Sequence, residues 1–208
     1  MVGIVTIDRD INYAQILLNS IIQNGIDMKD IYVCTRETDT KIIEFWKPIV
    51  NVITINHYDI LNRHNMNKIA NKRQILLDIA NDKKYDYIWF IDSDIIPTKN
   101  ILNKLLKIKS NVAIAPYPIK WMVDKSAVVG IKNEKIFICK NSGKIIRCTI
   151  GGMGCTLIHK SCFDIPFIVG KIVKNNFEYE GEDIGWFKQA NKRHKQIYCL
   201  DIIQQHFI

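Results

Sequence analysis

The segment from Tyr85 to Pro97 reads Tyr-Asp-Tyr-Ile-Trp-Phe-Ile-Asp-Ser-Asp-Ile-Ile-Pro. Its apolar run, Tyr87 to Ile91, shows no alternation with polar residues, which is typical of a central parallel strand covered on both faces. Asp92 and Asp94 then end the run. In open α/β sheets, ligands bind beyond the carboxyl ends of the strands, so the stretch Asp92-Ser93-Asp94 predicts a ligand site there.

Apolar runs and helical patterns alternate around this strand. We expect further strands over Val2–Ile7, Ile31–Thr35, Val50–Ile55 and Val112–Pro116, and helices between Asp10 and Gly25 and over Lys41–Trp46, Met66–Ala80 and Lys99–Lys107. Asp10 and Thr98 are the expected N-caps of the helices that follow them. The alternation predicts an α/β domain with a largely parallel sheet.

The second half of the chain has a different pattern. Short apolar runs separated by Gly, Asn and Ser predict hairpins rather than crossover units, over Val128–Ile131, Lys135–Cys139, Lys144–Ile150 and Cys155–His159. A last helix over Gly181–Ala190 and a last strand over Gln196–Leu200 follow. No repeat or linker divides the chain, so we expect a single domain.

Composition excludes several classes of protein. A chain of 208 residues with 48% hydrophobic residues, 10 Gly and 5 Pro suits a globular domain and excludes disordered and collagen-like chains. No apolar run approaches the ~20 residues that span a bilayer, and the first residues lack the basic start of a signal peptide. We therefore expect a soluble cytoplasmic protein, and six cysteines without a C-x-x-C pair predict reduced thiols.

The net charge of +8 is compatible with a polyanionic partner, either nucleic acid or a phosphorylated small molecule. Lys and Arg are scattered, however, and no aromatic and basic RNA-binding signature is present. Ile, Asn and Lys are all abundant, which indicates a general compositional bias. We therefore expect no nucleic-acid partner. A basic nucleic-acid-binding module is kept as the alternative interpretation of the chain's function.

The two aspartates after the apolar strand suit a metal ion. Carboxylates one residue apart repel each other unless a cation neutralises them, and hard oxygen ligands favour magnesium or manganese. Such an ion would bind a diphosphate well. The alternative is that Asp92 and Asp94 form a polar strand end that caps the following turn, and three residues alone leave both interpretations open.

In its full context, the segment from Tyr85 to Pro97 resembles the DXD segment of GT-A fold, nucleotide-sugar-dependent glycosyltransferases. Four other segments are similar to elements of that family, in the same order: the first strand and its end, a basic helix segment, a glycine-rich turn near the donor sugar and an acidic acceptor-side element. They are Val5-Thr-Ile-Asp-Arg9, Asn71-Lys-Arg73, Gly151-Gly-Met-Gly-Cys155 and Gly181-Glu-Asp-Ile-Gly-Trp186.

This resemblance implies a Rossmann-like GT-A fold with a mixed central sheet flanked by helices and a small, hairpin-rich acceptor half. Residues 1–208 would form one catalytic domain, with a nucleotide-binding half over 1–94 and an acceptor-side half over 95–208. The chain is short for this fold and is compatible with one module of a larger protein. The implied activity moves a sugar from a nucleoside diphosphate sugar, with a UDP-sugar favoured, to a hydroxyl of a glycan or another acceptor.

The resemblance also implies a metal site. Mn²⁺ or Mg²⁺ would be held by Asp94, by His206 and by Asp92, although Asp92 could instead contact the ribose. His206 could equally be a solvated residue near the chain end.

Donor contacts implied by the resemblance lie on both sides of the aspartates: Thr6, Asp8, Arg9, Lys72, Arg73, Asp92, Ser93, Gly151 and Gly152. Lys72 and Arg73 would contact the diphosphate, unless they lie on a solvated helix face. Gly151 and Gly152 would let the backbone approach the ligand, unless they only form a tight turn.

For catalysis, the resemblance implies that Asp183 is the general base of an inverting transfer and that Glu182 orients the acceptor. Acidic residues are favoured at a helix N-terminus whatever the function, so a purely structural role stays open for both. We expect Trp186 in the core rather than against a sugar.

A second enzyme class, sugar-phosphate nucleotidyltransferases, has a similar fold. That activity requires a glycine-rich, basic phosphate loop directly after the first strand. The stretch Thr6-Ile-Asp-Arg9 contains no glycine, which favours the glycosyltransferase interpretation.

Overall fold

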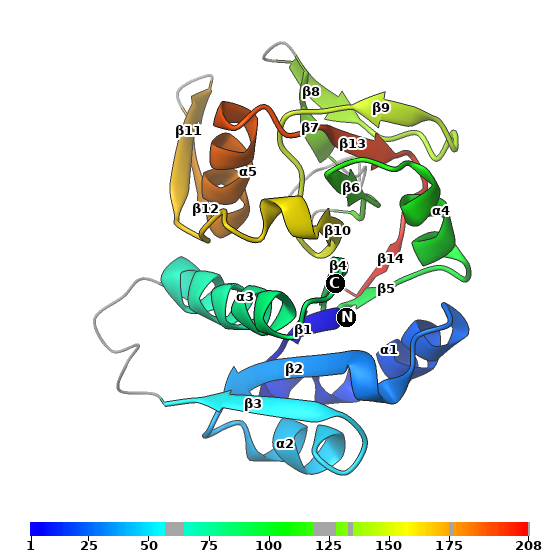
Figure 1. The fold of residues 1–208 in the computed structure, drawn as a ribbon, viewed down its shortest axis with the longest axis vertical. Helices are drawn as coiled ribbons and strands as arrows, with labels where there is room; N and C mark the ends of the chain where they lie inside the picture. Colours follow the sequence, from blue (N-terminus) through cyan, green and yellow to red (C-terminus); the bar gives the residue numbers. More distant parts are fainter. Residues whose placement is uncertain (57–64, 119–127, 133–134, 175–176, 208) are drawn as a thin grey trace.

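The computed structural model describes residues 1–56, 65–118, 128–132, 135–174 and 177–207, and its centre is an eight-stranded mixed sheet (Figure 1). The strand order is β3-β2-β1-β4-β10-β6-β13-β9. The strands are β1 (Val2–Val5), β2 (Ile31–Arg36), β3 (Asn51–Ile55), β4 (Tyr87–Asp92), β6 (Val112–Ile114), β9 (Ile145–Arg147), β10 (Cys155–His159) and β13 (Ile197–Leu200).

The first four strands of this order are parallel neighbours. β10 runs antiparallel to both β4 and β6, β13 runs parallel to β6, and β9 closes the sheet antiparallel to β13. The carboxyl ends of β1, β2, β4, β6 and β13 therefore point to one edge of the sheet, where the antiparallel β10 begins.

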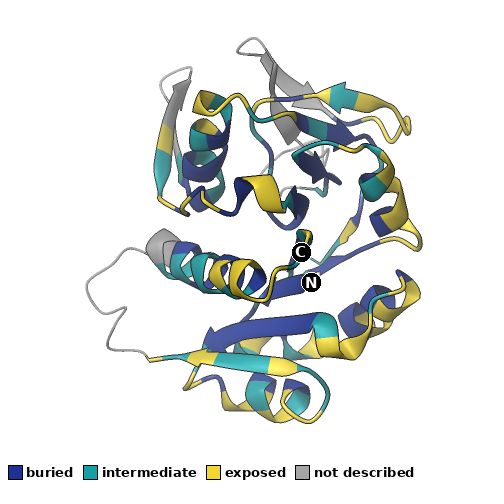
Figure 2. Cartoon of the chain, viewed as in Figure 1, coloured by how far each residue is buried: buried dark blue, intermediate teal, exposed yellow. Residues whose placement is uncertain are grey.

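Helices cover both faces of this sheet. One face packs against α3 (Asn65–Asp82) and α5 (Glu182–Lys192), and the other against α1 (Ile11–Gln23), α2 (Thr40–Trp46) and α4 (Ile101–Lys107). Side chains of β4 alternate between the two cores, because successive residues of a strand point to opposite faces. Figure 2 shows that strands such as β1 and β2 are buried, whereas the outer faces of the helices are exposed.

Three two-stranded sheets complete the described structure: β5 (Ile95–Ile96) with β14 (Gln205–His206), β7 (Val128–Lys132) with β8 (Lys135–Ile138), and β11 (Gly170–Lys174) with β12 (Phe177–Gly181). Short 3₁₀ turns lie over Asp8–Asp10, Met28–Asp30 and Lys160–Cys162.

The mixed α/β architecture predicted from the sequence is confirmed, but two of the expected hairpin strands are not hairpins. β10 lies inside the main sheet between β4 and β6, and β9 pairs with β13. Residues Cys155–Ile158 are fully buried apolar or Thr side chains, as an interior strand requires. Glycine and asparagine around a short run indicate its ends and carry no information about its partner.

Neither of the two predicted N-cap residues forms a capping hydrogen bond through its side chain. Thr98 does not cap α4, which begins at Ile101; the Thr98 backbone N–H and hydroxyl instead donate to Gln204 Oε1, at 2.7 and 3.1 Å. Asp10 does precede α1, but its side chain makes no cap hydrogen bond to that helix. In both cases a tertiary partner replaces the local one.

All six cysteines are buried and unpaired, as expected for reduced thiols. Burial raises the pKa of Cys34, Cys148 and Cys155 to about 12. Among the described residues, no helix is both long and apolar enough to span a bilayer.

Candidate active site

Polar residues from distant parts of the chain meet at the edge where the parallel strands end. Thr6 follows β1, Asp39 follows β2, Asp92 ends β4 and Tyr117 follows β6. The glycine-rich turn before β10 reaches the same edge, because the Asp92 N–H donates to the carbonyl of Gly154 at 2.9 Å. This is the position at which open α/β sheets bind ligands.

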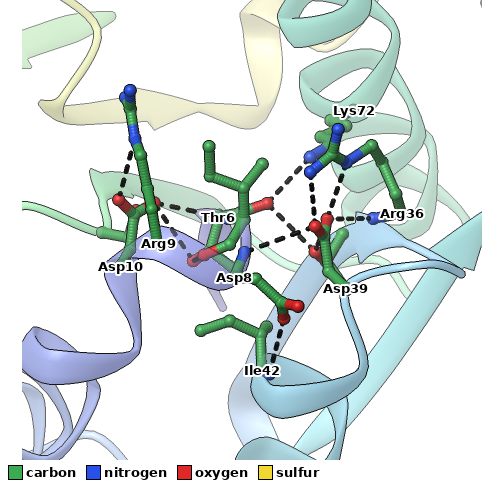
Figure 3. A network of polar contacts seen from close by, with 11 residues as sticks. Thr6, Asp8, Arg9, Asp10, Arg36, Asp39, Ile42 and Lys72 are labelled. Carbon is green, nitrogen blue, oxygen red and sulfur yellow. Dashed lines mark hydrogen bonds and ion pairs between the residues drawn. The ribbon is translucent and has the colours of Figure 1, made fainter.

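Lys72 contacts the end of β1, as Figure 3 shows. Its ammonium donates to the Thr6 carbonyl at 2.8 Å, and only 3% of the residue is exposed. Burial lowers the pKa of Lys72. The alternative in which Lys72 lies on a solvated helix face is therefore wrong: α3 turns this side chain into the sheet edge.

Asp8 and Asp39 connect the loops after β1 and β2 through hydrogen bonds (Figure 3). The Asp8 carboxylate accepts from the N–H of Ile42 at 3.1 Å, and the Asp8 N–H donates to Asp39 at 3.3 Å. Asp39 is buried and accepts from Thr35 Oγ1 at 2.8 Å and from Arg36 Nε at 2.9 Å. Although burial opposes ionisation, these hydrogen bonds lower the pKa of Asp39 to about 2.

Asp39 was not predicted from the sequence. Its signal was the spacing Arg36-x-x-Asp39 directly after a predicted strand, which suits a four-residue turn with the guanidinium and the carboxylate at its two ends.

Asp10 joins the loop after β1 to the loop after β4. Its carboxylate accepts from the Ser93 hydroxyl at 2.6 Å and from the Ile7 N–H at 3.3 Å. The Ser93 hydroxyl therefore points to a protein carboxylate. Arg9 lies nearby with 77% of its side chain exposed, and its Nε is 3.4 Å from Asp10 Oδ1 (Figure 3).

Arg73 connects the end of β4 to the start of α5. Its Nη2 donates to Asp92 Oδ1 at 2.7 Å and its Nε to Glu182 Oε1 at 3.2 Å, while only 3% of the side chain is exposed. The guanidinium also lies over the Phe90 ring, 5.6 Å from its centroid. Its third nitrogen, Nη1, has no hydrogen-bond partner among the described residues. The solvated-helix alternative is wrong for Arg73 too.

Burial acts on two carboxyl groups near Arg73, those of Asp183 and Asp92. Burial, and then the charge of Glu182, raise the pKa of Asp183 to about 7, and its Oδ1 accepts from the N–H of Ile184 at 2.7 Å. Burial also raises the pKa of Asp92, whereas Arg73 opposes that rise. Trp186, one turn further along α5, is fully buried and donates to the Ile165 carbonyl, so it belongs to the core as expected.

His206 lies against Asp94, with 3.3 Å between Nε2 and Oδ2. Its Nδ1 is 2.6 Å from the Pro118 carbonyl, which can only accept, so Nδ1 carries a hydrogen. In the neutral ring, Nε2 then directs its lone pair toward the Asp94 carboxylate. Two facing lone-pair donors suit a shared cation, and a carbonyl on the other ring nitrogen is the usual support of a metal-binding histidine.

Asp92, predicted to contact the metal or the ribose, accepts a hydrogen bond from Arg73 through Oδ1. In the part of the chain that the structure describes, no cluster of three or more His, Cys, Asp or Glu side chains is arranged to hold a metal ion. Asp94 and His206 fit such an ion by their chemistry and proximity.

Two glycines before β10 allow close approach of site residues. A Cβ on Gly154 would lie 2.5 Å from Asp92 Oδ2, and one on Gly152 would lie 2.2 Å from the Tyr117 hydroxyl oxygen. In the structure, the glycines of the predicted turn therefore leave space for the side chains of Asp92 and Tyr117. Gly151 precedes these two in the same turn and is buried.

No protein-family model matches the sequence, and neither does any curated protein. Several solved structures share the fold. The A197 protein of STIV aligns over 100% of this chain and 84% of its own, with 19% identity and a TM-score of 0.57. TarS from S. aureus, solved with UDP, aligns over 100% of this chain and 60% of its own, with 15% identity and a TM-score of 0.60.

TarS has also been solved with UDP-GlcNAc, and that structure aligns over 58% of its length with a TM-score of 0.59. This chain thus spans less than two thirds of TarS. At such identities, the likeness establishes the arrangement of helices and strands. The chain therefore shares with A197 and TarS a fold in which a mixed eight-stranded sheet lies between two layers of helices.

Proposed function

We propose that this chain is a metal-dependent glycosyltransferase that moves a sugar from a nucleoside diphosphate sugar to a hydroxyl of a glycan or another acceptor. The main observation is the excess of carboxylates at the sheet edge. Asp92 and Glu182 bind the guanidinium of Arg73, Asp183 directly follows Glu182, and Asp94 lies two residues after Asp92. A diphosphate would be repelled from this site unless a divalent cation neutralised it.

Asp94 and His206 would hold that ion, either Mn²⁺ or Mg²⁺, because their facing oxygen and nitrogen atoms suit either metal. When bound, the ion would act as a Lewis acid that offsets the charge on the leaving diphosphate. Asp92 remains a proposed third ligand or ribose contact. In the structure its Oδ1 accepts from Arg73 Nη2 at 2.7 Å.

The donor would lie along the edge from β1 to the glycine-rich turn. Thr6, Asp8 and Arg9 after the first strand would contact the nucleoside, and uridine is favoured because the similarly folded TarS was solved with UDP. Lys72 supports that loop from below through the Thr6 carbonyl. Ser93, which bonds Asp10 beside the loop after β1, and Gly151 and Gly152 in the glycine-rich turn would contact the diphosphate and the sugar.

Asp183 would remove the proton from the acceptor hydroxyl. A general base works best when its pKa is close to the working pH, and burial raises the pKa of Asp183 to about 7. Glu182, held by Arg73 Nε at 3.2 Å, would orient the acceptor. Arg73 thus links the donor-side Asp92 to the acceptor-side helix α5 through two hydrogen bonds.

Thermal unfolding with nucleotides tests this proposal. We expect Mn²⁺ together with UDP to stabilise the wild type, by about 2.7 kcal/mol when the ligand is at 100 times its Kd. UDP without metal should have little effect. Asp94→Asn should lose the metal-dependent stabilisation, whereas Asp78→Asn, an exposed change on α3, should keep it.

Two outcomes would contradict the proposal. One is a wild type that no nucleoside diphosphate stabilises, with or without Mn²⁺, across UDP, GDP, ADP and CDP. The other is stabilisation by an oligonucleotide that falls steeply with salt and is unchanged in Asp94→Asn, which would favour a nucleic-acid-binding module.

A further inference from the structure

Tyr117, just beyond the end of β6, inserts its phenol into the glycine-rich turn. Its hydroxyl oxygen accepts from the N–H of Gly154 at 3.2 Å. A Cβ on Gly152 would lie 2.2 Å from the same oxygen and 2.8 Å from the ring carbon that bears it. Any residue larger than glycine at position 152 would therefore displace the phenol, so the backbone is shaped around it.

The phenol lies between the donor side and the acceptor side of the site. Its ring packs edge-on against His206, with 5.6 Å between ring centroids. Asp92 approaches the same Gly154 whose N–H bonds the hydroxyl, since a Cβ there would be 2.5 Å from Asp92 Oδ2. Asp183 is also near enough for its charge to act on the phenol.

The hydroxyl keeps its proton at neutral pH. The ordinary pKa of a tyrosine hydroxyl is about 10, so the neutral form predominates. The hydroxyl accepts from Gly154, and among the described residues it donates to none. A tyrosine held in this way has a hydrogen available for a ligand.

We propose that Tyr117 donates this hydrogen to the transferred sugar of the nucleotide sugar and thereby contributes to the choice of donor. The inference rests on the proposed function. In a transfer, the reacting sugar carbon lies between the diphosphate, here beside Asp94 and His206, and the base, here Asp183. Tyr117 is the neutral donor that the structure places beside both, whereas the nucleoside would lie further along the edge, at β1.

Ligand binding to the protein loaded with Mn²⁺ tests the inference. Calorimetry would compare the Kd of UDP with those of UDP-glucose and UDP-N-acetylglucosamine, for the wild type and Tyr117→Phe. We expect unchanged UDP binding and about fivefold to tenfold weaker binding of the UDP-sugar that the wild type prefers, as the loss of one neutral hydrogen bond predicts. Tyr85→Phe is the matched control. Tyr85 lies just before β4, and its hydroxyl donates to Asp30 at 2.7 Å.

The variant Gly152→Ala provides a second test, because its Cβ would push the phenol out of the turn while the hydroxyl remains. It should weaken binding of the UDP-sugar more than binding of UDP, which keeps the inference testable if Tyr117→Phe does not fold. An equal loss of UDP and UDP-sugar binding, or no loss of either, would overturn the role of Tyr117. A wild type that binds no UDP would instead overturn the proposed function, and this inference with it.

Discussion

Nε2 of His206 lies 3.3 Å from Oδ2 of Asp94, and backbone pairing sets this position. β14 pairs antiparallel with β5, so that His206 lies opposite Ile95, and the N–H of Phe207 donates to the Asp94 carbonyl at 2.9 Å. The Phe207 ring stacks on Tyr13 of α1, with centroids 4.5 Å apart. The end of the chain is thus attached beside the end of β4.

His206→Ala should increase the Mn²⁺ concentration required for stabilisation by UDP at least tenfold, because one of the two paired ligands is lost. A titration of Mn²⁺ at constant UDP, followed by thermal unfolding, measures the shift. His194→Ala, at an exposed position, is the control and should leave the midpoint unchanged. An identical midpoint for His206→Ala would remove this residue from the metal site.

Arg73→Met should destabilise the fold by about 3–5 kcal/mol, because Asp92 and Glu182 lose their buried partner. Arg193→Met breaks an ion pair with Asp164 that is largely exposed, and should cost less than about 1 kcal/mol. Urea unfolding of both variants measures the difference. Equal costs would show that Arg73 does not hold the two carboxylates together.

Asp183 should make the fold less stable as the pH rises. Its pKa is about 7 in the folded protein and close to 3.8 in the unfolded chain, so between these values only the folded state binds the proton. Stability should therefore fall from about pH 4 to about pH 7 and then level off. Urea unfolding at pH 5 and pH 8 should show a smaller fall for Asp183→Asn than for the wild type; equal falls would contradict the raised pKa.

The same carboxyl group should control transfer. Activity of the wild type should rise as the pH passes about 7, because Asp183 must be ionised to accept the proton. Asp183→Asn should bind UDP with Mn²⁺ normally but lose transfer to any acceptor that the wild type uses. Product formation from a UDP-sugar across pH 5.5–8.5 measures both effects. Undiminished transfer in Asp183→Asn would exclude Asp183 as the base.

The six buried thiols should react only on unfolding, because burial keeps them from the reagent and raises the pKa of three of them to about 12. Titration with a thiol reagent at pH 8 should detect almost none in the native protein and all six in guanidinium chloride. Fewer than six after unfolding without a reductant would indicate a disulfide.

Most strands and helices, and the strand ends that carry the site, could be predicted from the sequence. The run Tyr87–Ile91 became the buried centre of β4, and the helix predicted over Met66–Ala80 became α3. Such elements follow from the periodicity of apolar residues, which is a local property. The place of β10 inside the main sheet could not be predicted, since a buried apolar strand fits several neighbours equally well.

The side-chain contacts that give the candidate site its chemical properties depend on tertiary structure. Arg73 was expected at a diphosphate, and folding places it between Asp92 and Glu182. Asp39 and Tyr117 were not singled out at all. These contacts join segments far apart in the chain, and no sequence period encodes them, because each depends on how helices pack across the sheet and on where the antiparallel β10 and β14 enter. Local patterns therefore located the site, whereas packing selected which side chains face one another in it.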